Sequence, residues 1–386
     1  MRFFESGIRP LVSSVLTHQQ PIYVQYYVTA RCNLRCVQCN VIYSNGDQEE
    51  CSLDQAKRIA SNLASIGTSI VLLTGGEPFA RSDLSKIAAS FIAEGIHPRI
   101  QTNGFASREQ LEEMVSIGVK DISISLDSLE PSVQDSLNGD VRHSWQEAIE
   151  KISIINEVFP ADSFCSLGCV LSPKNLSHVE SVIRFATEIG WWVSLVPAHQ
   201  TTTRSPRSFA TYDPNLVFPP DRYEELRCLV TTLKNMKHSG FNLYDSDEYL
   251  DDVVRYTTRN PIRWRRRNSN RCDSPNLYFA IQPNGDMSVC CDYRLSKKFP
   301  VWHDDFPKWY QNQLMFEEAQ EIADACSGCM YGSFPEITIS ARFYRPMFER
   351  ALLFAGSRSG RSLKRLSKVE MIDLASRIHS KRLAPE

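Results

Sequence analysis

The strongest constraint on the fold of this chain is a regular alternation of short apolar runs with longer amphipathic stretches over residues 22–196. The runs are rich in β-branched and aromatic residues, as in buried strands, and the stretches between them place apolar side chains at helical spacing. Such βα units surround a parallel sheet, which right-handed crossovers curl into a full or partial barrel. We therefore predict an α/β fold with a partial (β/α)6 barrel. Its predicted strands are 22–30, 69–73, 98–101, 121–126, 164–171 and 191–196.

Two of the predicted helices carry explicit start signals. Ser52 is followed three residues later by Gln55, and Ser107 is followed in the same way by Gln110. Both pairs fit the capping box, in which the two residues satisfy each other's backbone N–H groups. We expect helices to begin directly after Ser52 and Ser107.

Three unusual loops follow the first three predicted strands. They are the cysteine-rich segment 32–39, the run Gly75-Gly76-Glu77-Pro78 and the run Thr102-Asn103-Gly104. In a barrel of parallel strands the loops at the carboxyl ends share one rim, where binding and catalytic residues gather. We therefore predict a functional site at this rim.

Charge and hydropathy exclude several classes of function. The 386 residues include 43 Lys and Arg against 45 Asp and Glu, a net charge of −2, so we expect no nucleic-acid partner. No apolar run approaches the ~20 residues that cross a bilayer, so we expect no stable membrane insertion. The first residues lack the apolar stretch and cleavage site of a secretory signal, which predicts a cytoplasmic location.

The first cysteine group, Cys32-x3-Cys36-x2-Cys39, offers three thiolates within eight residues. A closed zinc site or iron–sulfur cluster normally takes four protein ligands. Three close ligands without a local fourth therefore indicate a metal site with one open position, where a small molecule can bind. Core thiols, or a zinc site completed by a distant residue, are the alternatives.

The motifs together resemble those of the radical S-adenosylmethionine (radical SAM) superfamily. They are CNLRCVQC after the first strand, GGEP after the second, TNG after the third and SISLDS in the fourth, and the resemblance covers roughly residues 20–200. It implies that Cys32, Cys36 and Cys39 hold a [4Fe-4S] cluster whose fourth iron binds SAM. Reductive cleavage of SAM then yields a 5′-deoxyadenosyl radical, which abstracts a substrate hydrogen.

The same resemblance implies the SAM contacts. Gly75, Gly76 and Glu77 would meet the SAM amino group, since glycines allow close backbone approach and a carboxylate can hold an ammonium. Asn103, Ser125 and Asp127 would lie near the ribose or the methionyl end. The family usually carries an aromatic residue before the third cysteine, near the adenine. Here that residue is Gln38, with Tyr43 as a substitute.

A second group comprises Cys272, Cys290, Cys326 and Cys329, with Asn284-Gly285 as a hairpin turn between residues 277–282 and 287–290. Four cysteines suit a closed metal site, and zinc is one candidate. Their spacing resembles the start of the SPASM extension of radical SAM enzymes, in its shorter "twitch" form. That resemblance implies an auxiliary [4Fe-4S] cluster with four protein ligands, in which Cys291 is the alternative to Cys290.

The predicted domains are a radical SAM barrel at 18–200, a linker with helices at 201–271, a twitch/SPASM-like auxiliary domain at 272–335 and a helical extension at 336–386. His199 follows the sixth strand at the rim, so we predict it as a substrate contact or proton acceptor. Arg204 and Tyr212 share that loop and are predicted in the same role.

The resemblance implies an enzyme, most plainly an oxidoreductase. We expect oxidation or rearrangement of a small polar metabolite, with an electron passed to the auxiliary cluster and a flavodoxin- or ferredoxin-type electron donor as partner. A peptide-modifying enzyme is the next alternative. A catalytically silent iron–sulfur or zinc protein with a binding or regulatory role is another.

Overall fold

The fold is known from a computed structural model, which describes residues 20–39, 49–199, 214–264, 272–326, 328–354 and 362–383. Tyr43, Arg204 and Tyr212 lie outside these ranges. Among the described residues, no helix is both long enough and apolar enough to cross a membrane.

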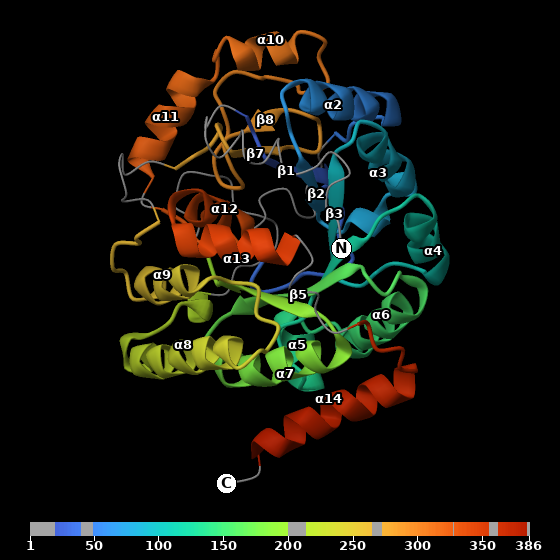
Figure 1. Cartoon of the computed structure of the whole chain (residues 1–386), viewed down its shortest axis with the longest axis vertical. Coiled ribbons are helices and arrows are strands. Elements are labelled where there is room, and N and C mark those ends of the chain that lie inside the picture. The colour runs from blue at the N-terminus through green and yellow to red at the C-terminus, as the bar shows by residue number, and fades with distance from the viewer. Residues whose placement is uncertain are drawn as a thin grey trace.

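The predicted partial barrel is confirmed. Its six strands run parallel and pair in chain order, each beside the next, with β6 at one edge. Helices flank the sheet (Figure 1). The apolar side chains of the strands and of these helices share one large core. The strands are β1 (Tyr23–Thr29), β2 (Ile70–Gly75), β3 (His97–Thr102), β4 (Asp121–Ser125), β5 (Phe164–Leu171) and β6 (Trp192–Pro197).

The crossover helices begin where the sequence predicts. Ser52 and Ser107 each accept a hydrogen bond from the backbone N–H three residues on, and both capping boxes are complete. These helices are α2 (Leu53–Ser65), α3 (Leu84–Ala93), α4 (Arg108–Ser116), α5 (Pro131–Leu137), α6 (Ser144–Val158) and α7 (Val179–Ile189), with the short 3-10 turns η1 (Pro78–Ala80) and η2 (Leu176–His178).

The second cysteine group lies on a continuation of the barrel sheet. The predicted hairpin forms from β7 (Tyr278–Ile281) and β8 (Met287–Ser288), and Gly285 in its turn has φ +88°. β7 pairs in parallel with β1, with Tyr23 opposite Tyr278, so the sheet has eight strands in the order β6-β5-β4-β3-β2-β1-β7-β8. Barrel and auxiliary segment therefore share one sheet.

Later helices complete the molecule. They are α8 (Tyr223–His238), α9 (Asp247–Thr257), α10 (Phe306–Gln311), α11 (Phe316–Ala325), α12 (Ser333–Arg342), α13 (Tyr344–Phe354) and α14 (Lys368–Leu383), together with the 3-10 turns η3 (Pro214–Leu216) and η4 (Pro220–Arg222). α10 and α14 lie at opposite ends of the molecule (Figure 1). The predicted boundary between residues 335 and 336 falls inside α12, because this continuous helix spans it, so the structure does not divide there.

The open edge of the barrel at β6 is covered by the segment that leads into α9. Leu243 forms a parallel bridge with Val193, and the buried Asp245 carboxylate accepts hydrogen bonds from the Leu195 N–H and the Ser194 hydroxyl. These contacts satisfy strand N–H groups that would otherwise face solvent at the edge.

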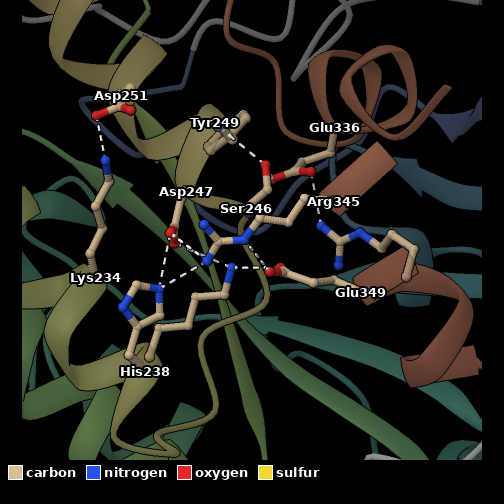
Figure 2. A network of polar contacts seen from close by, with 11 residues as sticks. Lys234, His238, Ser246, Asp247, Tyr249, Asp251, Glu336, Arg345 and Glu349 are labelled. Carbon is tan, nitrogen blue, oxygen red and sulfur yellow. Dashed lines mark hydrogen bonds and ion pairs between the residues drawn. The ribbon is translucent and has the colours of Figure 1, made fainter. Parts of the chain in front are cut away.

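A polar network then ties α9 to α12 and α13. The Glu336 carboxylate accepts hydrogen bonds from Ser246, and Arg345 pairs with both Asp247 and Glu349 (Figure 2). The helices that follow the second cysteine group are thereby fixed against the barrel edge.

Candidate functional site

The two glycines after β2 allow its end to pass close to the start of the cysteine loop. A Cβ on Gly75 would lie 2.3 Å from the Thr29 carbonyl oxygen, and one on Gly76 would lie 2.1 Å from the Arg31 carbonyl oxygen. Gly76 N–H donates to Thr29 O at 2.9 Å, and Glu77 N–H donates to Arg31 O at 2.7 Å. The glycines thus fix the cysteine loop on β2, and their contact with SAM stays a prediction.

Glu77 lies inside the rim, with a side chain that is completely buried. One carboxylate oxygen accepts from Phe79 N–H at 3.0 Å and from the Thr102 hydroxyl at 2.8 Å, and the other accepts from Asn103 N–H at 2.8 Å. Burial raises the pKa of Glu77 to about 7, against the opposing effect of these hydrogen bonds. Glu77 therefore joins the loops after β2 and β3, a role that the motif alone did not indicate.

The first cysteine group forms a loop over the rim at the end of β1. Cys32, Cys36 and Cys39 are partly exposed, and the Cys32 sulfur accepts from Leu34 N–H at 3.5 Å. Burial, followed by the charges of Cys39 and Cys32, raises the pKa of Cys36 well above its ordinary value. The three thiols are therefore close enough to interact electrostatically.

Asn103 and α5 hold this loop from two sides. The Asn103 amide lies 3.8 Å from the Cys32 sulfur and donates to the Asn33 side chain at 2.8 Å. At the end of α5, Val37 N–H donates to Leu137 O at 2.9 Å. A predicted SAM contact, Asn103, thus touches the cysteine loop.

Gln38 contacts Asp127, a pairing that sequence reasoning missed. Its amide donates to one Asp127 oxygen at 2.6 Å, and the other oxygen accepts from Val170 N–H at 2.6 Å. Asp127 is buried, which raises its pKa to about 7. The polar residue at the usual aromatic position therefore connects the cysteine loop to β4 and β5. Ser125 accepts a hydrogen bond from Gln101 at 3.2 Å, and its predicted contact with SAM remains untested.

The cysteines of the second group affect one another's charge. Burial raises the pKa of Cys329, as do the charges of Cys272 and Cys326, and Cys329 in turn raises the pKa of Cys290. These cysteines from three parts of the chain are thus close enough to interact electrostatically, and their role as one ligand set stays a prediction.

Hydrogen-bond donors point at the sulfurs of this second group. Asp292 N–H donates to Cys290 at 3.4 Å, and Gly328 N–H donates to Cys326 at 3.4 Å. These donors stand two residues beyond their cysteines, as Leu34 does beyond Cys32. Such N–H groups stabilise thiolates and tune iron–sulfur clusters. The donor set therefore fits an iron–sulfur cluster in each group.

Cys291 points away from the group. It is buried, and its sulfur donates to the Gln25 side chain on β1 at 3.7 Å. This geometry favours Cys290 over Cys291 as the ligand. Across the described ranges, no three His, Cys, Asp or Glu side chains are spaced to share a single metal ion. None of the twelve cysteines, all within those ranges, forms a disulfide.

His199 occupies a structural position instead of an open one. Its ring is 4% exposed and stacks between Tyr331 at 3.8 Å and Tyr256 at 5.0 Å. Its Nε2 accepts from Met330 N–H at 3.0 Å, and burial lowers its pKa to about 3. A ring whose accepting nitrogen is already bonded does not suit a proton acceptor, and the predicted substrate contact of His199 stays a prediction.

Known proteins share the sequence features of this region. Residues 26–186 match the Radical SAM superfamily. They form a radical SAM domain. Its cofactors are a [4Fe-4S] cluster and S-adenosylmethionine, which the three-cysteine loop and its N–H donors fit.

Curated relatives share this domain. The chain is 29% identical over 172 residues to the AdoMet-dependent heme synthase of Methanosarcina barkeri (44% of this chain, 48% of that protein). It is 27% identical over 179 residues to the PqqA peptide cyclase of Bradyrhizobium diazoefficiens (46% of each). The chain thus matches about half of the length of these relatives.

The overall fold is shared more widely. The structure of Streptococcus suis SuiB bound to precursor peptide SuiA superposes with a TM-score of 0.61 at 18% identity. The superposition covers 81% of this chain and 70% of SuiB, well beyond the radical SAM domain. The fold shared with SuiB therefore extends past residues 26–186.

Proposed function

We propose that this radical SAM protein oxidises its substrate by two electrons, with a second iron–sulfur cluster as electron acceptor. When bound, the first cluster and SAM supply the 5′-deoxyadenosyl radical that removes a substrate hydrogen. The observation that carries the proposal is the pair of cysteine groups, one with three thiols in the loop after β1 and one with four in the segments around the β7–β8 hairpin and after α11. Cys32, Cys36 and Cys39 are the proposed ligands of the first cluster.

The protein's own contribution at the rim is to hold the cysteine loop in one position. Glu77 fixes the loops after β2 and β3, and the Gln38–Asp127 hydrogen bond fixes the far side of the cysteine loop. Both carboxylates are buried. Rigid positioning of this kind reduces the entropic part of a reaction barrier.

We propose that each cysteine of the second group binds one iron of an auxiliary [4Fe-4S] cluster. These cysteines are Cys272, Cys290, Cys326 and Cys329. A cluster with four protein ligands has no open iron, so it would supply electron transfer and would not bind substrate. After loss of the first hydrogen, a carbon radical beside oxygen or nitrogen forms a double bond by losing one electron and one proton. The electron would go to this cluster, and the base that takes the proton is not His199 in the geometry described above.

A peptide side chain is the substrate class that we propose. Support comes from the PqqA peptide cyclase and from SuiB with its precursor peptide, which resemble this chain in sequence and in fold, respectively. A small polar metabolite, expected from the four-cysteine pattern, is the second candidate. In either case a flavodoxin- or ferredoxin-type protein is the proposed electron donor.

Formation of 5′-deoxyadenosine tests the proposal. Anaerobically reconstituted protein, given dithionite and SAM, should release 5′-deoxyadenosine and methionine, and the Cys36→Ala variant should release neither. No 5′-deoxyadenosine from iron-replete protein would instead support a silent binding or regulatory protein. Once a substrate is found, a product lighter by two hydrogens supports oxidation, and an unchanged mass contradicts it.

A further inference from the structure

One predicted ligand of the second group, Cys272, contacts the hydroxyl of a buried tyrosine. The Cys272 sulfur lies 3.3 Å from the Tyr278 hydroxyl oxygen, in a hydrogen bond that either atom can donate. At the other three cysteines the donors are backbone N–H groups, which no substitution removes cleanly. Tyr278 is therefore a side chain through which substitution can act on this group.

The surroundings of the hydroxyl leave its hydrogen available for sulfur. The Tyr278 oxygen accepts from Asp273 N–H at 3.3 Å, so one of its lone pairs is in use. Thr338 lies 3.0 Å from the same oxygen and donates its own hydrogen to the Asp273 carboxylate at 3.0 Å. The Tyr278 hydrogen thus has two acceptors within reach, Thr338 Oγ1 and Cys272 Sγ.

Metal binding decides between these acceptors. A metal-bound cysteine is a thiolate, which carries no hydrogen and accepts charge-assisted hydrogen bonds. A thiolate is a stronger acceptor than a neutral hydroxyl, so the Tyr278 hydrogen is directed to Cys272 when the cluster is present.

The ring of Tyr278 has a separate, structural role. It stacks on Phe334 with centroids 4.4 Å apart and planes 9° apart, and it lies on β7 in the core beside β1. Because Phe preserves this stack and lacks only the hydroxyl, the two roles of Tyr278 can be separated by one substitution.

We infer that the Tyr278 hydroxyl is a tuning group for the auxiliary cluster, raising its reduction potential by a hydrogen bond to Cys272. A donor at a cluster sulfur stabilises the reduced, more negative state. The cluster would then accept an electron from a substrate radical more readily. This inference rests on the proposed function, because it requires iron in the second group.

A potentiometric titration followed by electron paramagnetic resonance measures the effect in reconstituted full-length protein. The auxiliary signal is the one that persists when Cys32, Cys36 and Cys39 are replaced by Ala. The Tyr278→Phe protein should retain its iron. The equilibrium constant for reduction of the auxiliary cluster should fall roughly threefold to tenfold. At 59 mV per tenfold for one electron, this is a fall of roughly 30 to 60 mV.

Two further variants serve as a control and as a test of the competing acceptor. Tyr310→Phe removes another buried hydroxyl, which donates to Pro275 O at 2.7 Å, and should leave the potential unchanged. Thr338→Val removes the other acceptor and, because the Tyr278 hydrogen is already directed to Cys272 in the cluster-loaded protein, should not lower the potential.

Three results would overturn the inference. They are an unchanged potential in iron-replete Tyr278→Phe, a loss of iron from that variant, and a fall in potential in Thr338→Val. Failure of the proposed function appears differently, as zinc or missing iron in the second group of the unmodified protein, and it would overturn this inference as well.

Discussion

Gln38 donates a hydrogen bond of 2.6 Å to Asp127, joining the loop of the first cysteine group to the end of β4. The bond is partly buried, and Asp127 itself is 1% exposed. This hydrogen bond forms only when one side chain donates and the other accepts. This dependence makes the pair suitable for an exchange experiment.

Gln38→Glu should destabilise the loop, because it sets two carboxyl oxygens against each other. We expect a loss of about 1–3 kcal/mol in unfolding free energy and faster loss of iron from the first cluster. Combining Gln38→Glu with Asp127→Asn exchanges donor and acceptor, while the Asn oxygen still accepts from Val170 N–H. The double variant should therefore recover most of the stability. Additive losses, measured by urea unfolding, would show that the two side chains do not interact.

Glu77 should contribute to stability in the absence of SAM. Gln at this position has one acceptor oxygen, so its NH2 group would face either Phe79 N–H or Asn103 N–H. We expect Glu77→Gln to cost about 1–3 kcal/mol in the apoprotein, and Thr102→Val, which removes one donor, to cost about 0.5–1.5 kcal/mol. If Glu77 only held the SAM ammonium, SAM affinity would fall about 10- to 150-fold while apoprotein stability stayed unchanged.

Metal content should divide between the two cysteine groups. Reconstituted protein is expected to hold roughly eight irons, since each [4Fe-4S] cluster has four. Cys36→Ala should lose half of the iron and all SAM cleavage. Cys326→Ala with Cys329→Ala should lose the other half and retain some uncoupled cleavage. Cys291→Ala, the matched control, should keep both clusters, and stoichiometric zinc in anaerobic protein would contradict the auxiliary cluster.

Asp245 should make the stability of the apoprotein fall as pH rises. Burial, together with the charge of Glu336, raises its pKa from 3.8 to about 7, while the facing Arg350 lowers it. Between those values the folded protein binds a proton that the unfolded chain has released, so unfolding free energy decreases with pH. Tyr249, which also faces Asp245, does not ionise in this range.

Asp245→Asn retains an acceptor for Leu195 N–H and removes the titration. As pH rises from 5 to 8, the unfolding free energy of the variant should increase relative to that of the unmodified protein by on the order of 1–3 kcal/mol. Melting temperatures of the two apoproteins across this range check it. Parallel pH profiles would mean that Asp245 is ionised in the folded protein throughout.

The elements that the sequence predicted correctly depend on local physics. The Ser52–Gln55 capping box and the buried runs of the six strands act within a few residues, so their signals survive without the fold. The helical extension predicted for residues 336–386 includes α13 and most of α12, although Pro335 and Pro346 lie in these helices. Both prolines lie in the first turn of their helices, where no intrahelical N–H bond is lost.

The roles of single side chains were harder to predict. Spacing along the chain was enough to predict the two cysteine groups as ligand sets, and those sets stay predictions. The sequence could not show that Glu77 and His199 are buried with their acceptors already bonded, because those partners come from other strands and loops. Whether a polar side chain is buried depends on the whole fold. The sequence alone therefore cannot distinguish a side chain that contacts a ligand from one that connects neighbouring segments.

The parallel pairing of β1 with β7 also bears on how this protein is made. Residues 23–26 pair with residues 278–281, so one edge of β1 stays uncovered until the last third of the chain has been synthesised. Contacts this distant along the chain slow folding, and an open strand edge invites pairing with other molecules. A nascent or truncated chain that ends before β7 would therefore be prone to aggregate, and chaperones that shield strand edges should associate with it during translation.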